Sequence, residues 1–498
     1  MPLIQSRISF LISRKKATDF MSNRRPDIWL PTYLLTAASR AYDRHCRANR
    51  LTEIIFLVCD HFEPKHGAKD DKQPFNRLAA WQDGYSRLQE KCRISFNNVP
   101  VHTWFYPPHH GLEHLSSLSA MVFDGLGEVE LHYHHDGDTE ETLRRDLKKT
   151  LADYHRWGLL LNTGETPRSS FGFIHGDWAL NNSGEGKYCG VNNETDILAD
   201  LGCWGDMTMP SGNNCQTRKI NSIYYAAGDT SRPKSHDWGR DARVGKTNLP
   251  GLFMMQGPLG INWHAPGYPR IENASLTSEN WGRPDRIRKW LDCQIHVKGR
   301  PEWLFVKLHA HGAVERDFDA LFGEKAFQMH SDLNKHFNDG QRYRLHYVTA
   351  RQAYNIAKAA EHGHDGNAGN WRDYLVPPQP HSFYSINAAH DLLCCTSQHL
   401  LLTNIELSRS VQLRARLGPI REIAGEMSRV EIDVEKRVIE IVTTNDAKIT
   451  IQLVPGFRLI AVEGGLTNAN EGWQGKWEVR CGGSARIFWS DDPGSAAQ

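Results

Sequence analysis

Short apolar runs that end in polar residues recur along the first two thirds of the chain. The run at 53–60 (EIIFLVCD) is almost entirely apolar and closes on an acidic residue, which is typical of a buried strand. Similar runs predict further strands at 169–176, 251–257, 303–312 and 343–348.

Helical patterns lie between these runs. At 139–161, Leu143, Leu147, Leu151 and Tyr154 share one face and charged residues occupy the other. Asp138 precedes this segment like a capping residue, paired with Glu141 three positions later. A second helix is predicted at 350–361. Strands that alternate with helices indicate parallel pairing and an α/β fold, with its chemistry at the carboxyl ends of the strands.

The period changes after a Gly- and Asn-rich linker at 362–370. Beyond it, apolar and polar residues alternate with period two, and Gly, Asn and Asp interrupt the runs, which predicts an all-β, sandwich-like module. We therefore expect a basic leader and helix at 1–51, a β/α barrel at 52–362 and a β-sandwich-like domain at 371–498.

Composition narrows the class of protein. The 498 residues carry 59 basic and 58 acidic side chains, and a net charge of +1 argues against a dedicated nucleic-acid binder. No run approaches the ~20 apolar residues that a membrane helix needs. Ten scattered cysteines, none in a CxxC pair, favour reduced thiols and a cytoplasmic location. The first 20 residues are basic, and they predict a leader or a targeting peptide, with Met21 as an alternative start.

Histidines and carboxylates gather at the predicted strand ends. Asp60 ends the first run and His61 follows it, and His175 lies at the end of the run at 169–176. The segment 127–136 (GEVELHYHHD) holds three His and an Asp within five residues, with His132 and His134 on one strand face. Neutral imidazole is a good metal ligand, so the recurrence favours a metal site where the strand ends meet.

A further pair, His309 and His311, closes the run at 303–312. Read alone, each motif is also compatible with turn, capping or solvated polar residues. The weaker stretches 175–178 and 237–238, which contain Asp-Trp pairs, add little by themselves.

With these motifs in order, the sequence resembles the polysaccharide deacetylase family of the glycoside hydrolase/deacetylase barrel superfamily. The stretch 58–61 (VCDH) stands where the family has T-F-D-D, with His61 at the second acidic position. The stretch 127–132 (GEVELH) matches G-E-I-x-x-H, and 306–309 (VKLH) is similar to the family's L-x-H. The resemblance covers about residues 52–360 and echoes the family's middle motifs only at 175–178 and 237–238.

The resemblance implies a metal-dependent hydrolase that removes an N- or O-acetyl group from a sugar or glycan precursor. His61 and His132 would bind the metal together with Asp136, which holds the family's third ligand position; His134 is the alternative, and His135 is also close. Nitrogen-rich ligation favours Zn.

The resemblance also implies the catalytic roles. Asp60 would be the general base and His309 the acid that protonates the leaving group. Trp178 or Trp263 would stack on the sugar, although either is also compatible with an ordinary structural role. A cytoplasmic location would suit a glycan precursor as substrate.

Three other functions stay open. A glycoside hydrolase of the same superfamily needs a carboxylate pair, for which Asp60, Glu63, Asp177 and Asp206 are available. An amidohydrolase or phosphoesterase would use His309-Ala310-His311, but that class places its H-x-H on the first strand. A non-catalytic carbohydrate-binding relative would retain the fold with a relic site.

Overall fold

The computed structural model describes residues 24–267, 269–407, 410–464, 470–471 and 476–491. The predicted leader at 1–20 lies outside these residues. The described part of the chain begins with two helices, α2 (Pro26–Leu35) and α3 (Ala37–Arg47), which precede the first strand. Among the described residues, no helix is both long and apolar enough to cross a membrane.

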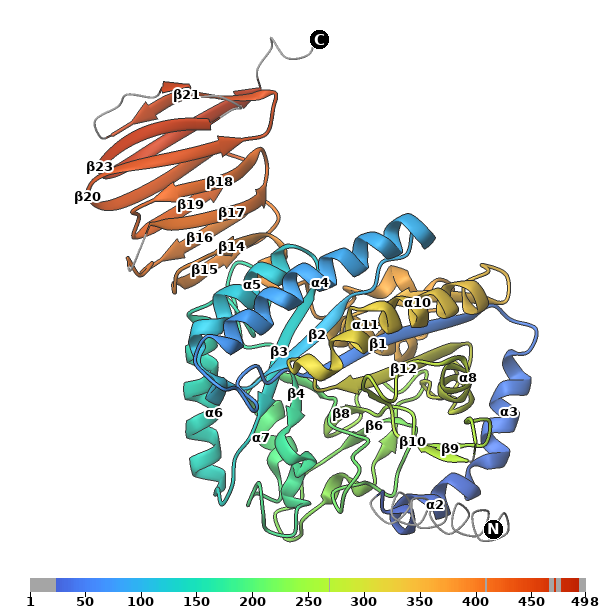
Figure 1. The fold of residues 1–498 in the computed structure, drawn as a ribbon. Coiled ribbons are helices and arrows are strands. Elements are labelled where there is room, and N and C mark those ends of the chain that lie inside the picture. Colours follow the sequence, from blue (N-terminus) through green and yellow to red (C-terminus); the bar gives the residue numbers. More distant parts are fainter. Residues whose placement is uncertain (1–23, 268, 408–409, 465–469, 472–475, 492–498) are drawn as a thin grey trace, which may run out of the picture. The chain divides into compact units, whose positions relative to one another are not determined.

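The larger sheet contains eleven strands and carries the first part of the fold (Figure 1). Its path is β11 (Ser275–Leu276), β12 (Trp303–Ala310), β1 (Thr52–His61), β2 (His102–Tyr106), β3 (Gly127–Tyr133), β4 (Phe171–His175), β5 (Cys203–Asp206), β8 (Leu252–Met255), β6 (Ile223–Ala226) and β7 (Arg240–Asp241). Strand β13 (Tyr343–Tyr347) pairs with β1 outside this path. The path has two ends, so the sheet of described strands is open.

Most pairs in this sheet are parallel. Strand β1 pairs in parallel with β12, β13 and β2, and the pairs β3–β4, β4–β5 and β5–β8 are also parallel. Strands β1 and β12 are buried along their whole length, as expected of apolar strands covered on both faces. The predicted α/β class is therefore confirmed.

Helices connect the strands of this sheet along the chain. They are α4 (Gln73–Phe96), α5 (Leu115–Phe123), α6 (Glu140–His155), α7 (Glu194–Asp200), α8 (Pro284–Asp292), α9 (Phe318–Leu321), α10 (Glu324–Phe337) and α11 (Ala350–Glu361). Helices α4 and α10 contact each other (Figure 1). A small antiparallel pair, β9 (Gly260–Asn262) and β10 (Arg270–Glu272), stands apart from the sheet.

The second sheet is antiparallel and contains ten strands among the residues that the structure describes. They are β14 (Tyr384–Ile386), β15 (Asp391–Cys395), β16 (His399–Thr403), β17 (Val411–Leu417), β18 (Ile420–Gly425), β19 (Arg429–Asp433), β20 (Val438–Leu453), β21 (Phe457–Glu463), β22 (Asn470–Glu471) and β23 (Lys476–Asp491). The first half of β20 pairs with β19 and its second half with β18, while β23 pairs with both halves.

The two halves of this sheet enclose one core. Ile439 and Ile441 from the first half of β20 belong to the same apolar cluster as Ile449 and Ile451 from its second half. The register shifts between Val442 and Asp446, as expected where long strands bend from one layer into the other. The predicted all-β module is thus present, built as a sandwich from a single bent sheet.

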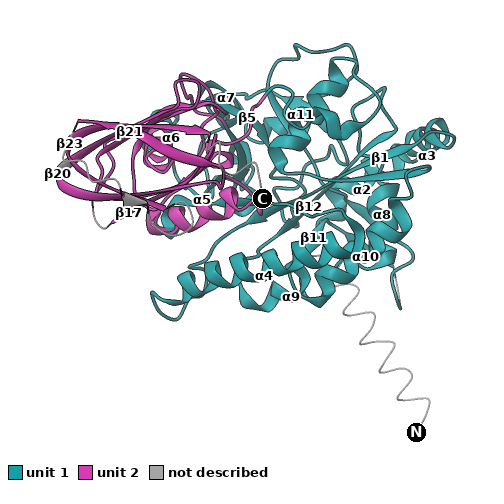
Figure 2. Cartoon of the chain, turned by 90° about the horizontal axis from the view of Figure 1, so that it is seen from above, with its two compact units in different colours: residues 1–110, 130–146, 171–375 teal, residues 111–129, 147–170, 376–498 magenta. Residues whose placement is uncertain are grey.

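The chain forms two compact units that differ from the division expected from the sequence (Figure 2). One comprises the described parts of residues 1–110, 130–146 and 171–375; the other comprises 111–129, 147–170 and 376–498. Segments 111–129 and 147–170 belong to the second unit because they bond to it. Gln379 Oε1 accepts the Val129 N–H at 3.1 Å, and the Gly164 N–H donates to the Cys395 carbonyl at 2.8 Å.

Several predicted boundaries hold and others need correction. Helix α11 has the predicted bounds, but α6 ends at His155, so residues 156–161 are not helical. The capping residue of α6 is Thr139, whose Oγ1 accepts the Thr142 N–H, and not Asp138. Asp138 instead binds Thr142 Oγ1 and His135 through its two carboxylate oxygens.

Candidate metal centre at the strand ends

Parallel pairing brings the predicted site segments to one edge of the larger sheet. Cys59 of β1 stands opposite His309 of β12 and opposite Thr103 of β2, so Asp60 and His61 emerge beside the end of β12. On the neighbouring pair, His132 of β3 stands opposite Ile174 of β4. The carboxyl ends of parallel strands share an edge, which explains how residues 250 positions apart meet.

His132, His134 and Glu63 form the first group that fits a cation. One ligand atom from each lies within 4.8 Å of the others. His132 Nε2 and His134 Nε2 are 2.9 Å apart, and Glu63 Oε1 is 3.3 Å from His134 Nε2 and 3.9 Å from His132 Nε2.

The tautomers of the two rings sharpen this fit. His132 Nδ1 donates to the Ile174 carbonyl at 3.0 Å, and His134 Nδ1 lies 3.3 Å from Asp177 Oδ2. A neutral imidazole carries one N–H, so both Nε2 atoms present lone pairs to the same space. A proton or a metal ion between them removes the repulsion, and outer partners of this kind orient metal-binding histidines.

His61 borders this group and has a donor atom to offer. Its side chain is buried, and its Nε2 has no hydrogen-bond partner among the residues that the structure describes. Its ring centre is 4.8 Å from those of His132 and His311. Two imidazoles on one zinc ion, each bonded at about 2.0–2.1 Å, have ring centres roughly 5 Å apart. Glu63, His132 and His134 therefore fit the implied metal and His61 borders them, and we call these four residues the strand-end cluster.

The charges of the cluster also suit a cation. Burial, His311 and His132 hold the pKa of His61 well below its usual value, and burial with His134 lowers that of His132 to about 3. Burial would raise the pKa of Glu63, but its hydrogen bond to His134 and the nearby His132 bring it to about 2. Although burial opposes it, Glu63 and Asp177 raise the pKa of His134, so a divalent metal would bind here by replacing the proton of that ring.

Asp136, the preferred third ligand, does not lie in this cluster. Its side chain is exposed, and its Oδ1 accepts the Tyr188 N–H at 2.6 Å. The residue stands beyond the end of β3, where the chain leaves the strand direction, so the spacing taken from the family motif does not place it beside His132. His134, the alternative ligand, occupies the position expected of Asp136. His135 turns to a different group of residues.

Asp60 is held in a buried pair. Its Oδ2 lies 3.0 Å from His102 Nε2, and its Oδ1 accepts the Gly312 N–H at 2.6 Å. Trp81 Nε1 donates to the Gly312 carbonyl at 2.7 Å, which fixes the same loop. Sequence patterns did not indicate His102, because this residue begins β2 instead of ending a strand. Glu63 was considered only as a carboxylate of the glycosidase alternative.

The remaining predicted residues divide between the cluster and other places. His309 is buried, with its ring centre 6.1 Å from that of His61, and Trp178 lies 5.6 Å from His61. Burial, with Lys307 and His311 nearby, holds the pKa of His309 well below its usual value. Trp263 lines a separate pocket of about 200 Å³ that is also lined by Tyr33 and Arg40.

The carboxylates considered for a glycosidase form hydrogen bonds or ion pairs with neighbouring side chains. Glu63 and Asp177 bind opposite nitrogens of the His134 ring, each at 3.3 Å. Asp206 is buried and accepts the Thr208 hydroxyl at 2.6 Å; burial raises its pKa to about 7. Thus Glu63 and Asp177 share an imidazole instead of standing across an open space.

Comparisons with known proteins were made for the whole chain. No family model and no curated protein matches it. Among solved structures, it is similar to a Parabacteroides distasonis protein named "putative glycoside hydrolase/deacetylase", at 9% identity over 81% of this chain and 84% of that one, with a TM-score of 0.33.

The chain is also similar to the catalytic module of a family 98 glycoside hydrolase from Streptococcus pneumoniae TIGR4. That identity is 7% over 90% of this chain and 86% of the module, with a TM-score of 0.19. At TM-scores this low, neither likeness supports a conclusion about function. Any conclusion about function therefore has to rest on the site residues.

Proposed function

We propose that this chain is a metal-dependent hydrolase that removes an acetyl group from a nitrogen or oxygen of a sugar or glycan precursor. The observation that carries the proposal is the strand-end cluster, in which the facing Nε2 atoms of His132 and His134 meet Glu63 beside the unpartnered Nε2 of His61. The resemblance of its motifs to the polysaccharide deacetylases supports acetyl removal, and the fold would then be a partly closed barrel of that superfamily.

In this proposal the strand-end cluster holds one divalent ion. Three imidazoles and one carboxylate favour zinc over magnesium. When bound, the metal supplies a Lewis acid that activates water and polarises the acetyl carbonyl. His134 replaces Asp136 in the ligand set, because its ring lies against His132.

Asp60 and His309 move the protons. Asp60 accepts a proton from the attacking water, and its bonds to His102 and to the Gly312 N–H fix the direction of its carboxylate. His309 delivers a proton to the departing sugar nitrogen or oxygen. The attacking water gives up two protons over the reaction: Asp60 accepts the first, and the second would pass through His309 to the leaving group, because burial lowers the pKa of His309 and keeps its free imidazole neutral.

The test combines metal analysis with an acetate-release screen on the purified full chain. We expect a bound divalent metal, acetate release from at least one N- or O-acetylated sugar, loss of release after chelation, and its return with zinc. His134→Ala should lose both metal and activity. The matched control is His399→Ala, since His399 lies in β16 of the second sheet and pairs with Glu431.

Other outcomes would overturn the proposal. Release of reducing sugar without acetate would indicate a glycoside hydrolase. A metal-loaded protein that binds sugars and releases acetate from none of the screened substrates would indicate a non-catalytic relative.

A further inference from the structure

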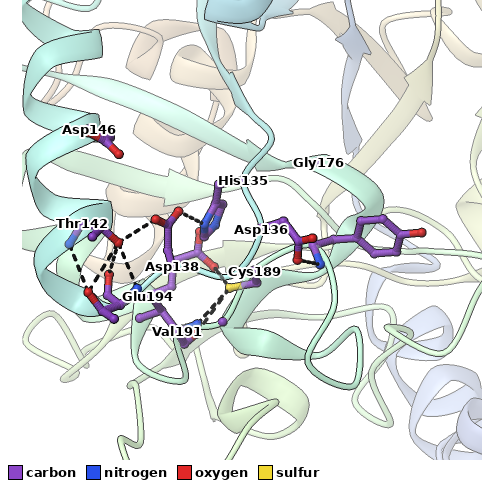
Figure 3. Close-up of polar contacts among 12 residues, drawn as sticks. His135, Asp136, Asp138, Thr142, Asp146, Gly176, Cys189, Val191 and Glu194 are labelled. Carbon is purple, nitrogen blue, oxygen red and sulfur yellow. Dashed lines mark hydrogen bonds and ion pairs between the residues drawn. The ribbon is translucent and has the colours of Figure 1, made fainter.

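A separate group of side chains that could hold a metal ion shares no residue with the strand-end cluster. It consists of His135 just after β3, His175 at the end of β4, Cys189 in the following loop and Glu194 at the start of α7. Figure 3 shows His135, Cys189 and Glu194 converging, whereas Asp136 turns away. We call these four residues the Cys–His cluster.

One ligand atom from each of the four residues lies within 4.8 Å of the others. His135 Nε2 is 3.0 Å from His175 Nε2 and 3.2 Å from Glu194 Oε1. Glu194 Oε2 is 3.4 Å from His175 Nε2 and 3.5 Å from Cys189 Sγ. Ligands bonded to one zinc ion at about 2.0–2.3 Å lie roughly 3.3–3.7 Å apart, so little movement separates this arrangement from a filled site.

The outer contacts of the two imidazoles point to a cation. His135 Nδ1 lies 2.8 Å from Asp138 Oδ2, and His175 Nδ1 contacts the Gly176 carbonyl. If both rings were neutral, these acceptors would take their single N–H groups and leave two Nε2 lone pairs facing each other at 3.0 Å. Against the effect of burial, hydrogen bonds to Glu194 and Asp138 raise the pKa of His135, so without a metal ion a proton on His135 bridges this place, and a bound cation would replace that proton. A carboxylate or carbonyl behind each histidine is the usual support of a metal-binding imidazole.

The sulfur and the burial agree with this assignment. The Val191 N–H donates to Cys189 Sγ at 3.4 Å, which favours negative charge on the sulfur, whereas burial and Glu194 raise the pKa of the free thiol. A bound metal ion would displace the thiol proton. The side chains of His175 and Glu194 are fully buried, and that of His135 is 4% exposed. A site with four protein ligands and no opening to solvent is structural, because a catalytic zinc keeps one position for water or substrate.

We propose that His135, His175, Cys189 and Glu194 bind a second divalent metal ion, zinc, in a closed structural site. The ion would tie together the ends of β3 and β4, the loop at Cys189 and the start of α7. The proposal of this second site does not depend on the hydrolase proposal, because the ligands and the role of the second ion differ from those of the strand-end cluster.

The second ion would also place a ligand of the first. His134 and His135 are consecutive but belong to different clusters, and Gly176 directly follows His175. A Cβ on Gly176 would overlap the His134 ring, so the backbone at His175 forms the surface on which that ring rests. Fixing His135 and His175 therefore fixes His134.

Cobalt substitution tests the site without any assay of activity. Among the described residues, Cys189 is the one cysteine in a group that fits a metal. The full chain, stripped of metal and refilled with Co²⁺, should bind two equivalents and show thiolate-to-cobalt charge-transfer absorption. Cys189→Ser should abolish that absorption and lower the zinc content from two equivalents per chain to one.

The control is Cys92→Ser, which changes another buried thiol, in α4, and should leave the absorption intact. The wild-type protein provides a test that does not depend on a variant folding. If Co²⁺ binds the wild type without charge-transfer absorption, or if Cys189→Ser keeps the absorption, the second site is refuted. One bound ion with the absorption present would support the second site and count against the strand-end cluster.

Discussion

Replacing Asp60 by Asn separates a general base from a structural carboxylate. The substitution keeps the size of the side chain and one acceptor oxygen, so the Gly312 N–H retains its partner. It removes the negative charge that faces His102 Nε2. If Asp60 accepts the proton of the attacking water, the variant should fold and bind metal but turn over slowly.

The magnitudes of the two effects differ enough to be measured. Hydrogen bonds to a charged group contribute about 1.5–3 kcal/mol and neutral ones about 0.5–1.5 kcal/mol. Weakening two bonds therefore costs about 2 kcal/mol of folding free energy. Loss of a general base typically costs ~10²–10⁴-fold in rate, equivalent to about 2.7–5.4 kcal/mol in the barrier.

The assay measures kcat, metal content and Tm on one preparation. We expect kcat to fall at least about a hundredfold, metal content to stay unchanged and Tm to fall by a few degrees. Asp317→Asn is the matched control, since Asp317 is a buried carboxylate that accepts the Ser278 N–H at 3.0 Å. Turnover within a few-fold of the wild type would refute the base assignment, and joint loss of metal and turnover would make Asp60 a ligand.

Three further predictions concern other residues. His61→Ala should remove the ion of the strand-end cluster and leave the cobalt–thiolate absorption in place; an unchanged metal count would contradict its role as a ligand. Gly176→Ala should displace the His134 ring and weaken zinc binding at the strand-end cluster at least tenfold. A competition titration with a chelator measures this affinity, and an unaltered affinity would show that the His134 ring moves aside without cost. Burial raises the pKa of Asp206 to about 7, so the stability it contributes is complete below the unfolded pKa of about 3.9 and is lost as pH rises toward 7. Asp206→Asn should therefore raise Tm more at pH 8 than at pH 5, and a pH-independent difference would show that Asp206 does not titrate in this window.

Sequence patterns predicted the elements that are long or strongly apolar. The strand at 53–60 appears as β1 and the helix at 350–361 as α11 with its exact bounds. The 24-residue helix α4 was missed, although Leu78, Trp81, Tyr85, Leu88 and Cys92 are buried at helical spacing and could have indicated it. Four-residue strands such as β5 lack enough positions for a periodic signal.

The candidate site was predicted where it depends on strand direction. His132 and His134 share a strand face, so alternation along β3 brings them together, and parallel pairing brings His61 to the same edge. Asp136 was misplaced because a motif spacing cannot specify how a loop turns. His102 meets Asp60 at a separation of 42 positions and Glu194 meets His135 at a separation of 59, which no local pattern encodes, and Cys189 joins them through Glu194.

The two 16-residue strands β20 and β23 have a consequence for how the second sheet forms. Every pair between them, from Val438–Phe488 to Gln452–Lys476, joins distant parts of the chain, and each strand serves both layers of the sandwich. Contacts of such long sequence separation slow folding, because loop closure must precede the gain from pairing. Strands β18, β19 and β20 can pair before β23 arrives, but the other edge of β20 is covered only when β23 pairs with it. That last step should be slow, and nascent chains that end before β23 would expose this edge of β20 to aggregation.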